Sequence, residues 1–320
     1  MTLDARASGV FAIAATPFAA DGALDLDGVD RLTDFYLKAG VSGLTILGIM
    51  GEAQKLEPEE SVAIAKRVCA RANVPVVVGV SAPGFAAMRR MAREAMEAGA
   101  AGVMIAPTPG LRTDDQIVDY FAQAVEAVGA DVPFVLQDYP LTLNVVMTPG
   151  VIRRIVEQNA SCVMLKHEDW PGLDKISTLR KWQREDGLRP FSILCGNGAL
   201  FLDFETERGA DGAMTGYAFP EMLADVVRLQ KEGRRDAAHD IYDAHLPLVR
   251  YEQQAGIGLA VRKYVLWRRG AIATDALRKP GASLNAAARA EVDYLLSRVA
   301  RIDPRAALRP VAGAPGAPPA

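Results

Sequence analysis

The run Cys162-Val163-Met164-Leu165-Lys166 joins four hydrophobic residues to a single lysine. A short, continuous hydrophobic run of this kind is typical of a parallel β-strand that is buried on both faces. If several such strands close into a barrel, a lysine at the carboxyl end of one strand lies at the mouth, where α/β barrels place their reactive groups. The run therefore predicts both a fold and a position for chemistry.

Similar hydrophobic runs alternate with longer amphipathic segments along the chain. Together with 162–166, the expected strands are 10–15, 43–47, 76–80, 102–106, 134–137, 191–195 and 212–215. The expected helices between them are 27–39, 58–71, 85–98, 114–128, 149–158, 172–185, 198–207 and 220–232. Eight strand–helix units at a spacing of roughly 30 residues predict an α/β protein with one (β/α)8 TIM barrel. A doubly wound open sheet, the alternative, normally has a glycine-rich turn after its first strand, and Ala14-Ala15-Thr16-Pro17 lacks one.

The chain is expected to divide into a barrel (1–232), extra C-terminal helices that pack on it (233–302) and a tail (303–320). The expected C-terminal helices are 234–254, 257–269 and 283–300. Ser283 is the expected N-cap of the last one. The tail is rich in proline and alanine and is expected to be disordered. His239 and His245 are expected to face solvent or a subunit contact.

The composition is that of a soluble enzyme-sized protein and argues against several function classes. Of the 320 residues, 50% are hydrophobic and 23% are charged, and the net charge of −3 gives no basis for binding nucleic acid or an anionic membrane. No apolar run approaches the ~20 residues of a membrane helix, and residues 1–9 lack the features of a signal peptide. The three cysteines form no CxxC pair and no disulfide framework, so a reduced, cytoplasmic protein is expected.

Lys166 is the first candidate for a catalytic residue. Burial penalises a lysine ammonium and favours the neutral amine, which can attack a carbonyl group. Side chains alternate along a strand, so Glu168 lies on the same face as Lys166 while His167 lies on the other, where a structural role is expected. Glu168 is a candidate acid or base beside an imine. The alternative is that Lys166 reaches solvent or pairs with Glu168 as a counter-ion. No His/Asp/Glu group has metal-ligand spacing, so no metal is expected.

Five landmarks follow the expected strands in order: Ala15-Thr16-Pro17-Phe18, Gly48-Ile49-Met50-Gly51-Glu52, Val135-Leu136-Gln137-Asp138-Tyr139-Pro140, Lys166, and Cys195-Gly196-Asn197-Gly198. With these landmarks the chain resembles the dihydrodipicolinate synthase/N-acetylneuraminate lyase superfamily of Schiff-base, class I aldolase-type barrels over nearly its whole length. The resemblance implies that Lys166 forms a Schiff base with a 2-keto acid and that no other cofactor is needed. It also implies a homo-oligomer, a dimer or a tetramer.

The resemblance implies a substrate site around Lys166. The loop 48–52 would hold the keto acid's carboxylate on main-chain N–H groups, without a cation. The implied substrate-binding residues are Ile49, Met50, Gly196, Asn197 and Thr215.

Four departures separate the chain from the dihydrodipicolinate synthases, one of which is the loop Thr108-Pro109-Gly110, where those enzymes have a tyrosine. Gln137 stands where aldolase-type members have a proton-transferring tyrosine, and a glutamine cannot titrate. Ile49 replaces a hydroxyl residue, and Thr142 stands where those enzymes have an arginine for the second substrate. Gln137 is therefore expected to act through a bound water, and lysine-biosynthetic activity is not expected.

A closer resemblance is to the L-2-keto-3-deoxyarabonate dehydratase-like members. It rests on the segment Gln137–Pro140, the Lys166-x-Glu168 pattern, the run Gly212-Ala213-Met214-Thr215-Gly216, and a late stretch with Leu246-Pro247-Leu248, Glu252 and Gly256-Ile257. The resemblance implies a lyase, most simply a hydro-lyase (dehydratase), that acts on an unphosphorylated 2-keto-3-deoxy sugar acid. The alternatives are a pyruvate-releasing aldolase, a dihydrodipicolinate synthase-like enzyme, and a non-catalytic 2-keto-acid-binding protein.

Overall fold

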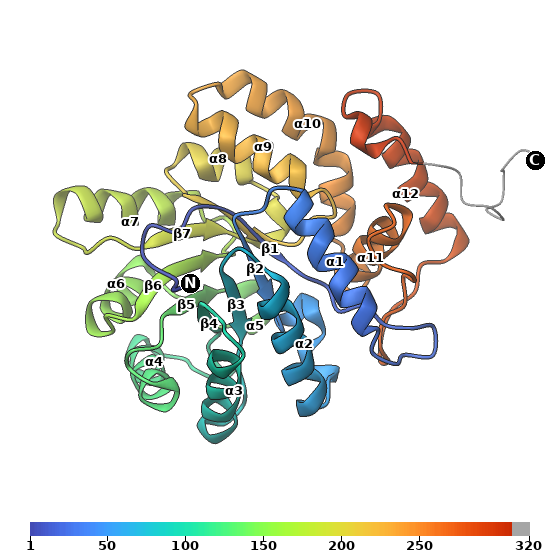
Figure 1. The fold of residues 1–320 in the computed structure, drawn as a ribbon. Coiled ribbons are helices and arrows are strands. Elements are labelled where there is room, and N and C mark those ends of the chain that lie inside the picture. Colours follow the sequence, from blue (N-terminus) through green and yellow to red (C-terminus); the bar gives the residue numbers. More distant parts are fainter. Residues whose placement is uncertain (309–320) are drawn as a thin grey trace, which may run out of the picture.

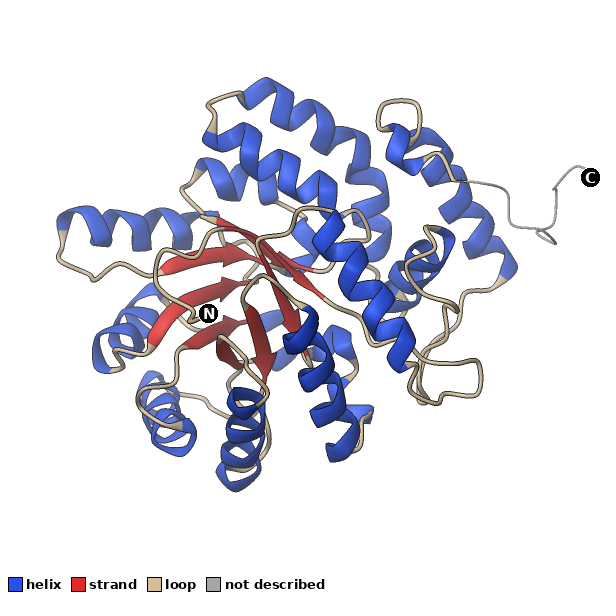
Figure 2. Cartoon of the chain, in the orientation of Figure 1, coloured by secondary structure: helices blue, strands red, loops and turns tan. Residues whose placement is uncertain are grey.

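The computed structural model describes residues 1–308 and shows a closed barrel of eight parallel strands in chain order (Figure 1). The strands are β1 (Gly9–Ile13), β2 (Gly43–Ile46), β3 (Val76–Gly79), β4 (Gly102–Ile105), β5 (Phe134–Asp138), β6 (Cys162–His167), β7 (Ser192–Cys195) and β8 (Gly212–Thr215). Helices surround the strands on the outside (Figure 2). The predicted (β/α)8 TIM barrel with extra C-terminal helices is confirmed.

Several of the helices between the strands begin at start signals in the sequence. They are α1 (Leu26–Lys38), α2 (Pro58–Arg71), α3 (Phe85–Glu97), α4 (Asp114–Val128), α5 (Pro140–Leu143), α6 (Pro149–Gln158), α7 (Leu173–Glu185), α8 (Leu202–Glu207) and α9 (Pro220–Lys231). Thr113 and Gln116 form a capping box at the start of α4, and Thr148 caps α6. The short helix α5 was not predicted, because a single turn has no hydrophobic periodicity to reveal it.

Alternating side chains divide the barrel into an interior and an outer layer. The interior cluster consists of Leu3, Phe11, Ile13, Val77, Ala101, Met104, Val135, Met164, Leu194 and Met214. The other buried strand residues, such as Leu136 and Leu165, pack outward against the helices. Two-residue alternation from Met164 therefore places Lys166 on the interior face, at the carboxyl end of β6.

Three further helices, α10 (Arg235–Glu252), α11 (Gly258–Arg268) and α12 (Ala286–Val299), follow the barrel. Helix α10 packs on α9, and α12 packs on α10 (Figure 1). The prediction that Ser283 caps the last helix is wrong. Asn285 is the N-cap, because its side chain accepts a hydrogen bond from the Ala288 N–H. No helix within residues 1–308 is long and apolar enough to cross a membrane.

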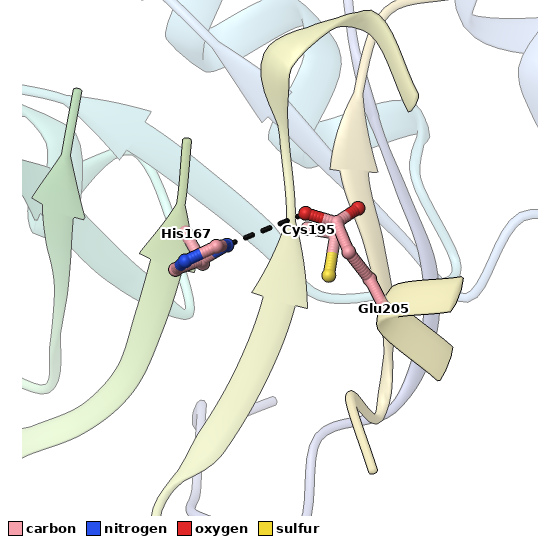
Figure 3. A group of neighbouring side chains, drawn as sticks. All are labelled: His167, Cys195 and Glu205. Carbon is pink, nitrogen blue, oxygen red and sulfur yellow. Dashed lines mark ion pairs between the residues drawn. The ribbon is translucent and has the colours of Figure 1, made fainter. Parts of the chain in front are cut away.

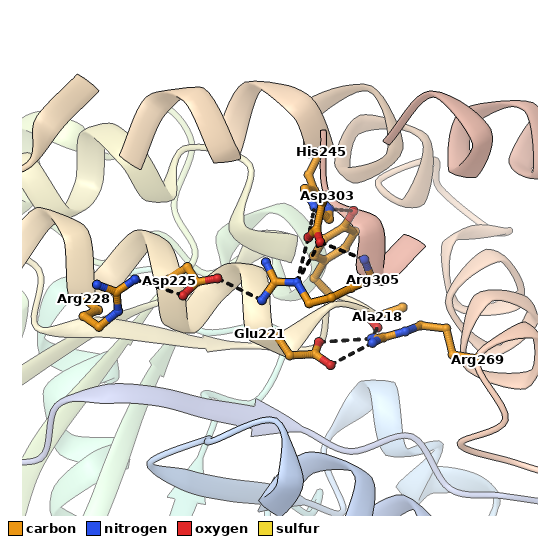
Figure 4. Close-up of polar contacts among 9 residues, drawn as sticks. Ala218, Glu221, Asp225, Arg228, His245, Arg269, Asp303 and Arg305 are labelled. Atoms are coloured by element: carbon orange, nitrogen blue, oxygen red, sulfur yellow. Dashed lines mark hydrogen bonds and ion pairs between the residues drawn. The ribbon is translucent and has the colours of Figure 1, made fainter. Parts of the chain in front are cut away.

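The end of the described chain is tied to the helical extension, contrary to two expectations. His245 is fully buried and lies 2.9 Å from the Tyr217 hydroxyl and 3.0 Å from Asp303, so the prediction that it faces solvent or a subunit contact is wrong (Figure 4). Asp303 is buried as well and pairs with Arg305, so disorder does not begin at residue 303. Residues 309–320, which carry the rest of that expectation, lie outside the described part. His239 is partly buried and forms ion pairs with Asp203 and Glu207.

Candidate active site

Lys166 is enclosed at the carboxyl end of β6. The register pairs it with Gln137 of β5 on one side and with Leu194 of β7 on the other. Its exposed fraction is 4%. A lysine is rarely this well buried unless its ammonium has a partner.

Glu168 is that partner and is the centre of the site. Its Oε2 lies 2.8 Å from Lys166 Nζ and accepts a hydrogen bond of 2.7 Å from the Gln137 side-chain amide. Its Oε1 accepts a bond of 3.3 Å from the Asn197 main-chain N–H. Lys166 is thus buried and is also paired with Glu168. The burial and the pairing that the sequence analysis gave as alternatives occur together. Because the ion pair joins Nζ directly to a carboxylate, a proton can pass from the ammonium to Glu168.

Gly196 gives Glu168 the room that it occupies. A Cβ atom at position 196 would lie 2.3 Å from Glu168 Cγ, so any larger residue would displace the carboxylate. Gly196 and Asn197 thus contact Glu168 directly, one through its lack of a side chain and the other through its main chain. The turn after β7 therefore shapes the site around Lys166.

The loop 48–52 lies at the end of β2 and forms a single 3-10 turn at Ile49–Gly51. The Thr16 hydroxyl donates to the Gly51 carbonyl at 2.6 Å. Glu52 has a left-handed backbone (φ 53°), which costs a non-glycine residue free energy and must be held by contacts. Its carboxylate accepts hydrogen bonds from Lys263 at 2.6 Å and from Lys55 at 2.8 Å. These contacts fix the turn in one conformation.

A cavity of about 580 Å³ connects this turn to Gln137. Ile49 lines it and is 39% exposed, while Met50 is partly buried and packs against the interior cluster. The cavity continues outward over β3 to the space between α2 and α3. Its lining reaches the carboxyl end of β5 at Gln137, the register neighbour of Lys166, and does not include Lys166 or Glu168.

Thr215 is not brought to Lys166. It is buried at the end of β8, and it shares the outward parity of Ala213, which packs in the outer cluster, whereas Met214 faces the interior. No hydrogen bond within residues 1–308 joins Thr215 to Lys166 or to Glu168. Of the expected substrate-binding residues, it is the one that the geometry supports least.

A second polar row lies behind Lys166, on the outer face of the same strands. Asp138, His167 and Cys195 are adjacent in register. Burial raises the pKa of Asp138, and Lys175 at 2.7 Å opposes that effect. The parity prediction that His167 points away from Lys166 agrees with this row.

His167, Cys195 and Glu205 of α8 point toward one another (Figure 3). Their ligand-type atoms all lie within 4.8 Å of one another, and His167 Nδ1 is 3.4 Å from Glu205. Sequence spacing could not show this grouping, because its members lie far apart in the chain, and the expectation of no metal stays a prediction. Burial, followed by the nearby Glu205 carboxylate, raises the pKa of the Cys195 thiol.

The sequence did not reveal that α11 contributes to the site. Residues 260–266 of this helix are all buried, including two cations, Arg262 and Lys263. Arg262 pairs with Glu252 at 2.6 Å, and Lys263 pairs with Glu52. The available signal was two adjacent cations inside an otherwise apolar helical segment, which a buried helix tolerates only when each cation has a partner.

Comparisons with known proteins give the family. The chain is 30% identical over 307 residues, 93% of its length and 96% of the relative's, to an L-2-keto-3-deoxyarabonate dehydratase of Azospirillum brasilense. It is 28% identical to a probable 2-dehydro-3-deoxy-D-pentonate aldolase of Escherichia coli, over 81% of this chain and 90% of that one. A crystal structure of a dihydrodipicolinate synthase from Rhodopseudomonas palustris is 67% identical, with a TM-score of 0.92 over 93% of this chain and 99% of the other. Residues 6–299 match the dihydrodipicolinate synthetase family, and the chain therefore belongs to this family of lyases.

Proposed function

We propose that the protein is a Schiff-base-forming dehydratase for a 2-keto-3-deoxy sugar acid and that Lys166 is its nucleophile. The observation that carries the proposal is the enclosed Lys166–Glu168–Gln137 group at the carboxyl ends of β5 and β6. The family's chemistry proceeds through a lysine Schiff base. The dehydratase relative aligns over nearly the full length of both chains, and it supports loss of water as the reaction.

In the first step the substrate carboxylate lies on the main-chain N–H groups of Ile49 and Met50. Glu168 takes a proton from Lys166 across the 2.8 Å contact, and the neutral amine attacks the C2 ketone. The carbinolamine loses its oxygen as water, which leaves a protonated imine. Glu168 is placed to return a proton to the departing oxygen.

In the second step the cationic imine acidifies the hydrogens on C3. A base removes one of them, and the resulting enamine expels the C4 hydroxyl as water once that oxygen has been protonated. Glu168, and a water held by Gln137, are the groups placed for these transfers. Hydrolysis of the unsaturated imine then releases the product and regenerates Lys166.

Dihydrodipicolinate synthase activity is the second candidate, because the crystal structure at 67% identity belongs to a protein described as one. Gln137 argues against it. A glutamine has no ionisable proton to relay to a second substrate, and Thr142 offers no positive charge to bind a second carboxylate. Aldol cleavage is distinguished by its product, since only carbon–carbon cleavage releases pyruvate.

The test combines adduct trapping with product analysis. The protein is incubated with 2-keto-3-deoxy-L-arabonate and borohydride, and the intact mass and the modified lysine are determined. We expect one adduct per chain on Lys166, no pyruvate in the unreduced reaction, and no product from pyruvate with aspartate semialdehyde. Lys166→Ala should abolish both the adduct and turnover, while the control Lys175→Met, which alters another buried lysine, should keep the adduct. Turnover without an adduct, or pyruvate release, would overturn the proposal.

A further inference from the structure

Arg262 reaches the mouth of the barrel from α11. Its exposed fraction is 3%, and its Nη1 occupies the space beside Gly216, just after β8. A Cβ atom on Gly216 would lie 2.4 Å from that nitrogen and 2.9 Å from the Ile13 carbonyl oxygen. Because Gly216 shares the inward parity of Met214, this space is on the barrel side of the strand end. Gly216 thus leaves an opening that the guanidinium fills.

Glu252 holds the guanidinium by one edge. The Arg262 Nε donates to Glu252 Oε1 at 2.6 Å, and both side chains are buried. Within residues 1–308 the two terminal nitrogens of Arg262 donate to no group. A guanidinium has five N–H donors in a fixed plane, so four of them remain for a ligand once Nε is engaged.

Tyr139 lies next to the Lys166 group. Tyr139 follows Gln137 by two residues and therefore shares its inward parity. The hydrogen-bond ladder between β5 and β6 continues past the strand ends, because the Glu168 N–H donates to the Asp138 carbonyl at 2.8 Å. Tyr139 thus lies beside Glu168. Burial raises the pKa of the Tyr139 phenol, while nearby Glu168 raises it and Arg262 lowers it. The register thus places Tyr139 beside Glu168, while the contact with Gly216 places the Arg262 guanidinium at the end of β8, two strands from Lys166 in the barrel.

We propose that Arg262 binds the hydroxyl oxygens at the end of the substrate that lies away from the keto-acid carboxylate. This inference rests on the proposed function, in which the loop 48–52 holds the carboxylate end. The remaining end of a 2-keto-3-deoxy pentonate carries oxygens on C4 and C5, and Arg262 offers unused donors on another side of the mouth. Arg262 is a specificity-determining residue of the site.

An uncharged, hydroxylated end fits this site better than a second carboxylate. The positive charge of Arg262 is already balanced by Glu252, and Glu168 adds a further negative charge nearby. A second substrate carboxylate would therefore enter a region with no net positive charge. Hydroxyl oxygens accept hydrogen bonds from the guanidinium without adding charge.

The experiment compares two ligands on the full chain. Pyruvate has the keto acid but no distal hydroxyls, and 2-keto-3-deoxy-L-arabonate has both. The half-saturating concentration for borohydride trapping is measured for each ligand with wild-type protein, Arg262→Lys and Arg269→Lys. Arg269 is a matched control, since it also extends from the end of α11 but binds the Ala218 carbonyl and Glu221 (Figure 4).

For Arg262→Lys we expect the half-saturating concentration of the sugar acid to rise by about 10- to 100-fold, because hydrogen bonds from a charged donor are lost. The value for pyruvate should stay within about twofold, as should both values for Arg269→Lys. An equal rise for both ligands would show a structural role for Arg262, and no rise for either would also overturn the inference.

Gly216→Ala tests the same site from the strand side. The added methyl group displaces the guanidinium, so this variant too should weaken binding of the sugar acid more than binding of pyruvate. This variant keeps the inference testable if Arg262→Lys fails to fold. If the wild-type protein traps neither ligand, the proposed function fails instead.

Discussion

Gln137 and Lys166 share a single oxygen atom, since both contact Oε2 of Glu168, at 2.7 Å and 2.8 Å. The amide that stands in place of a tyrosine therefore orients the carboxylate and supplies no proton of its own. Oε1 is fixed separately by the Asn197 N–H. Glu168 thus links Gln137, Lys166 and the turn after β7.

Glu168→Gln distinguishes an acid–base role from a counter-ion role. We expect kcat to fall by about 10²–10⁴-fold, the usual contribution of a positioned acid or base, with little change in KM. Gln137→Leu keeps the Glu168 carboxylate and should lower kcat only about tenfold, the effect of one lost hydrogen bond to a charged group. Steady-state rates of water loss provide the measurement. A Glu168→Gln enzyme within threefold of the wild-type kcat would leave Glu168 as a counter-ion alone.

Glu52→Gln should weaken the carboxylate site without touching Lys166. Burial lowers the pKa of Lys263, and Glu52 opposes that shift, so removing the carboxylate leaves a buried cation without its partner. We expect a loss of about 3–5 kcal/mol in the free energy of unfolding and a higher half-saturating concentration for pyruvate.

The double variant Glu52→Gln/Lys263→Met separates these two effects. It removes the stranded cation and should recover much of the stability, but not the affinity for pyruvate, because the turn at 48–52 still lacks its anchor. Urea unfolding and borohydride trapping give the two readouts. Full recovery of affinity would contradict the anchoring role of Glu52.

The cysteines should be unreactive in the native protein. Burial raises the pKa of Cys69 to about 11 and that of Cys162 to about 12, and the pKa of Cys195 lies well above its usual value. Because the thiolate is the reactive form, we expect less than about one thiol per chain to react with Ellman's reagent at pH 8 within minutes. All three should react in urea. Fast native labelling of Cys195 would contradict the burial of the His167–Cys195–Glu205 group.

Asp303 should make the folded protein less stable at acidic pH. Burial alone would raise its pKa, but hydrogen bonds from His245 and Arg305 outweigh burial and the pKa is lowered. A carboxyl group with a lowered pKa stabilises the fold above its unfolded pKa, and that contribution is lost as the pH falls below about 4. Burial lowers the pKa of His245, so this residue too favours unfolding as the pH falls below the ordinary pKa of histidine.

Asp303→Asn measures this contribution. At pH 7 the variant should unfold more easily by about 1–3 kcal/mol, the range for hydrogen bonds to charged groups, and the gap to wild type should narrow toward pH 3.5. The exposed Asp236 provides a control, since Asp236→Asn should show no such gap. A gap that is constant with pH would mean that Asp303 acts through packing alone.

The barrel could be predicted from the sequence because its strands and helices are local, periodic signals. All eight strands lie within a residue or two of their predicted ranges, and β6 ends one residue after Lys166. Alternation also separated Lys166 and Glu168 from His167. Such features depend only on neighbours along the chain.

The features that were missed depend on contacts between distant residues. Glu52 meets Lys263 across 211 positions of sequence, and His245 meets Asp303 across 58. A polar residue in a helix reads as solvent-exposed until its buried partner is known, which explains the wrong prediction for His245. For Arg262 the sequence held a partial signal, since the helix around it is apolar on every side.

The dependence of the turn at 48–52 on Lys263 and on the Arg278 main-chain N–H has a consequence for biosynthesis. A nascent chain that has emerged from the ribosome only as far as β8 already contains every strand, Lys166 and Lys55, but not the other two groups that hold the Glu52 carboxylate, Lys263 and the Arg278 N–H. The turn at 48–52 lacks two of these three donors until α11 and the segment after it have been translated. The barrel strands alone therefore do not complete the contacts that hold this turn.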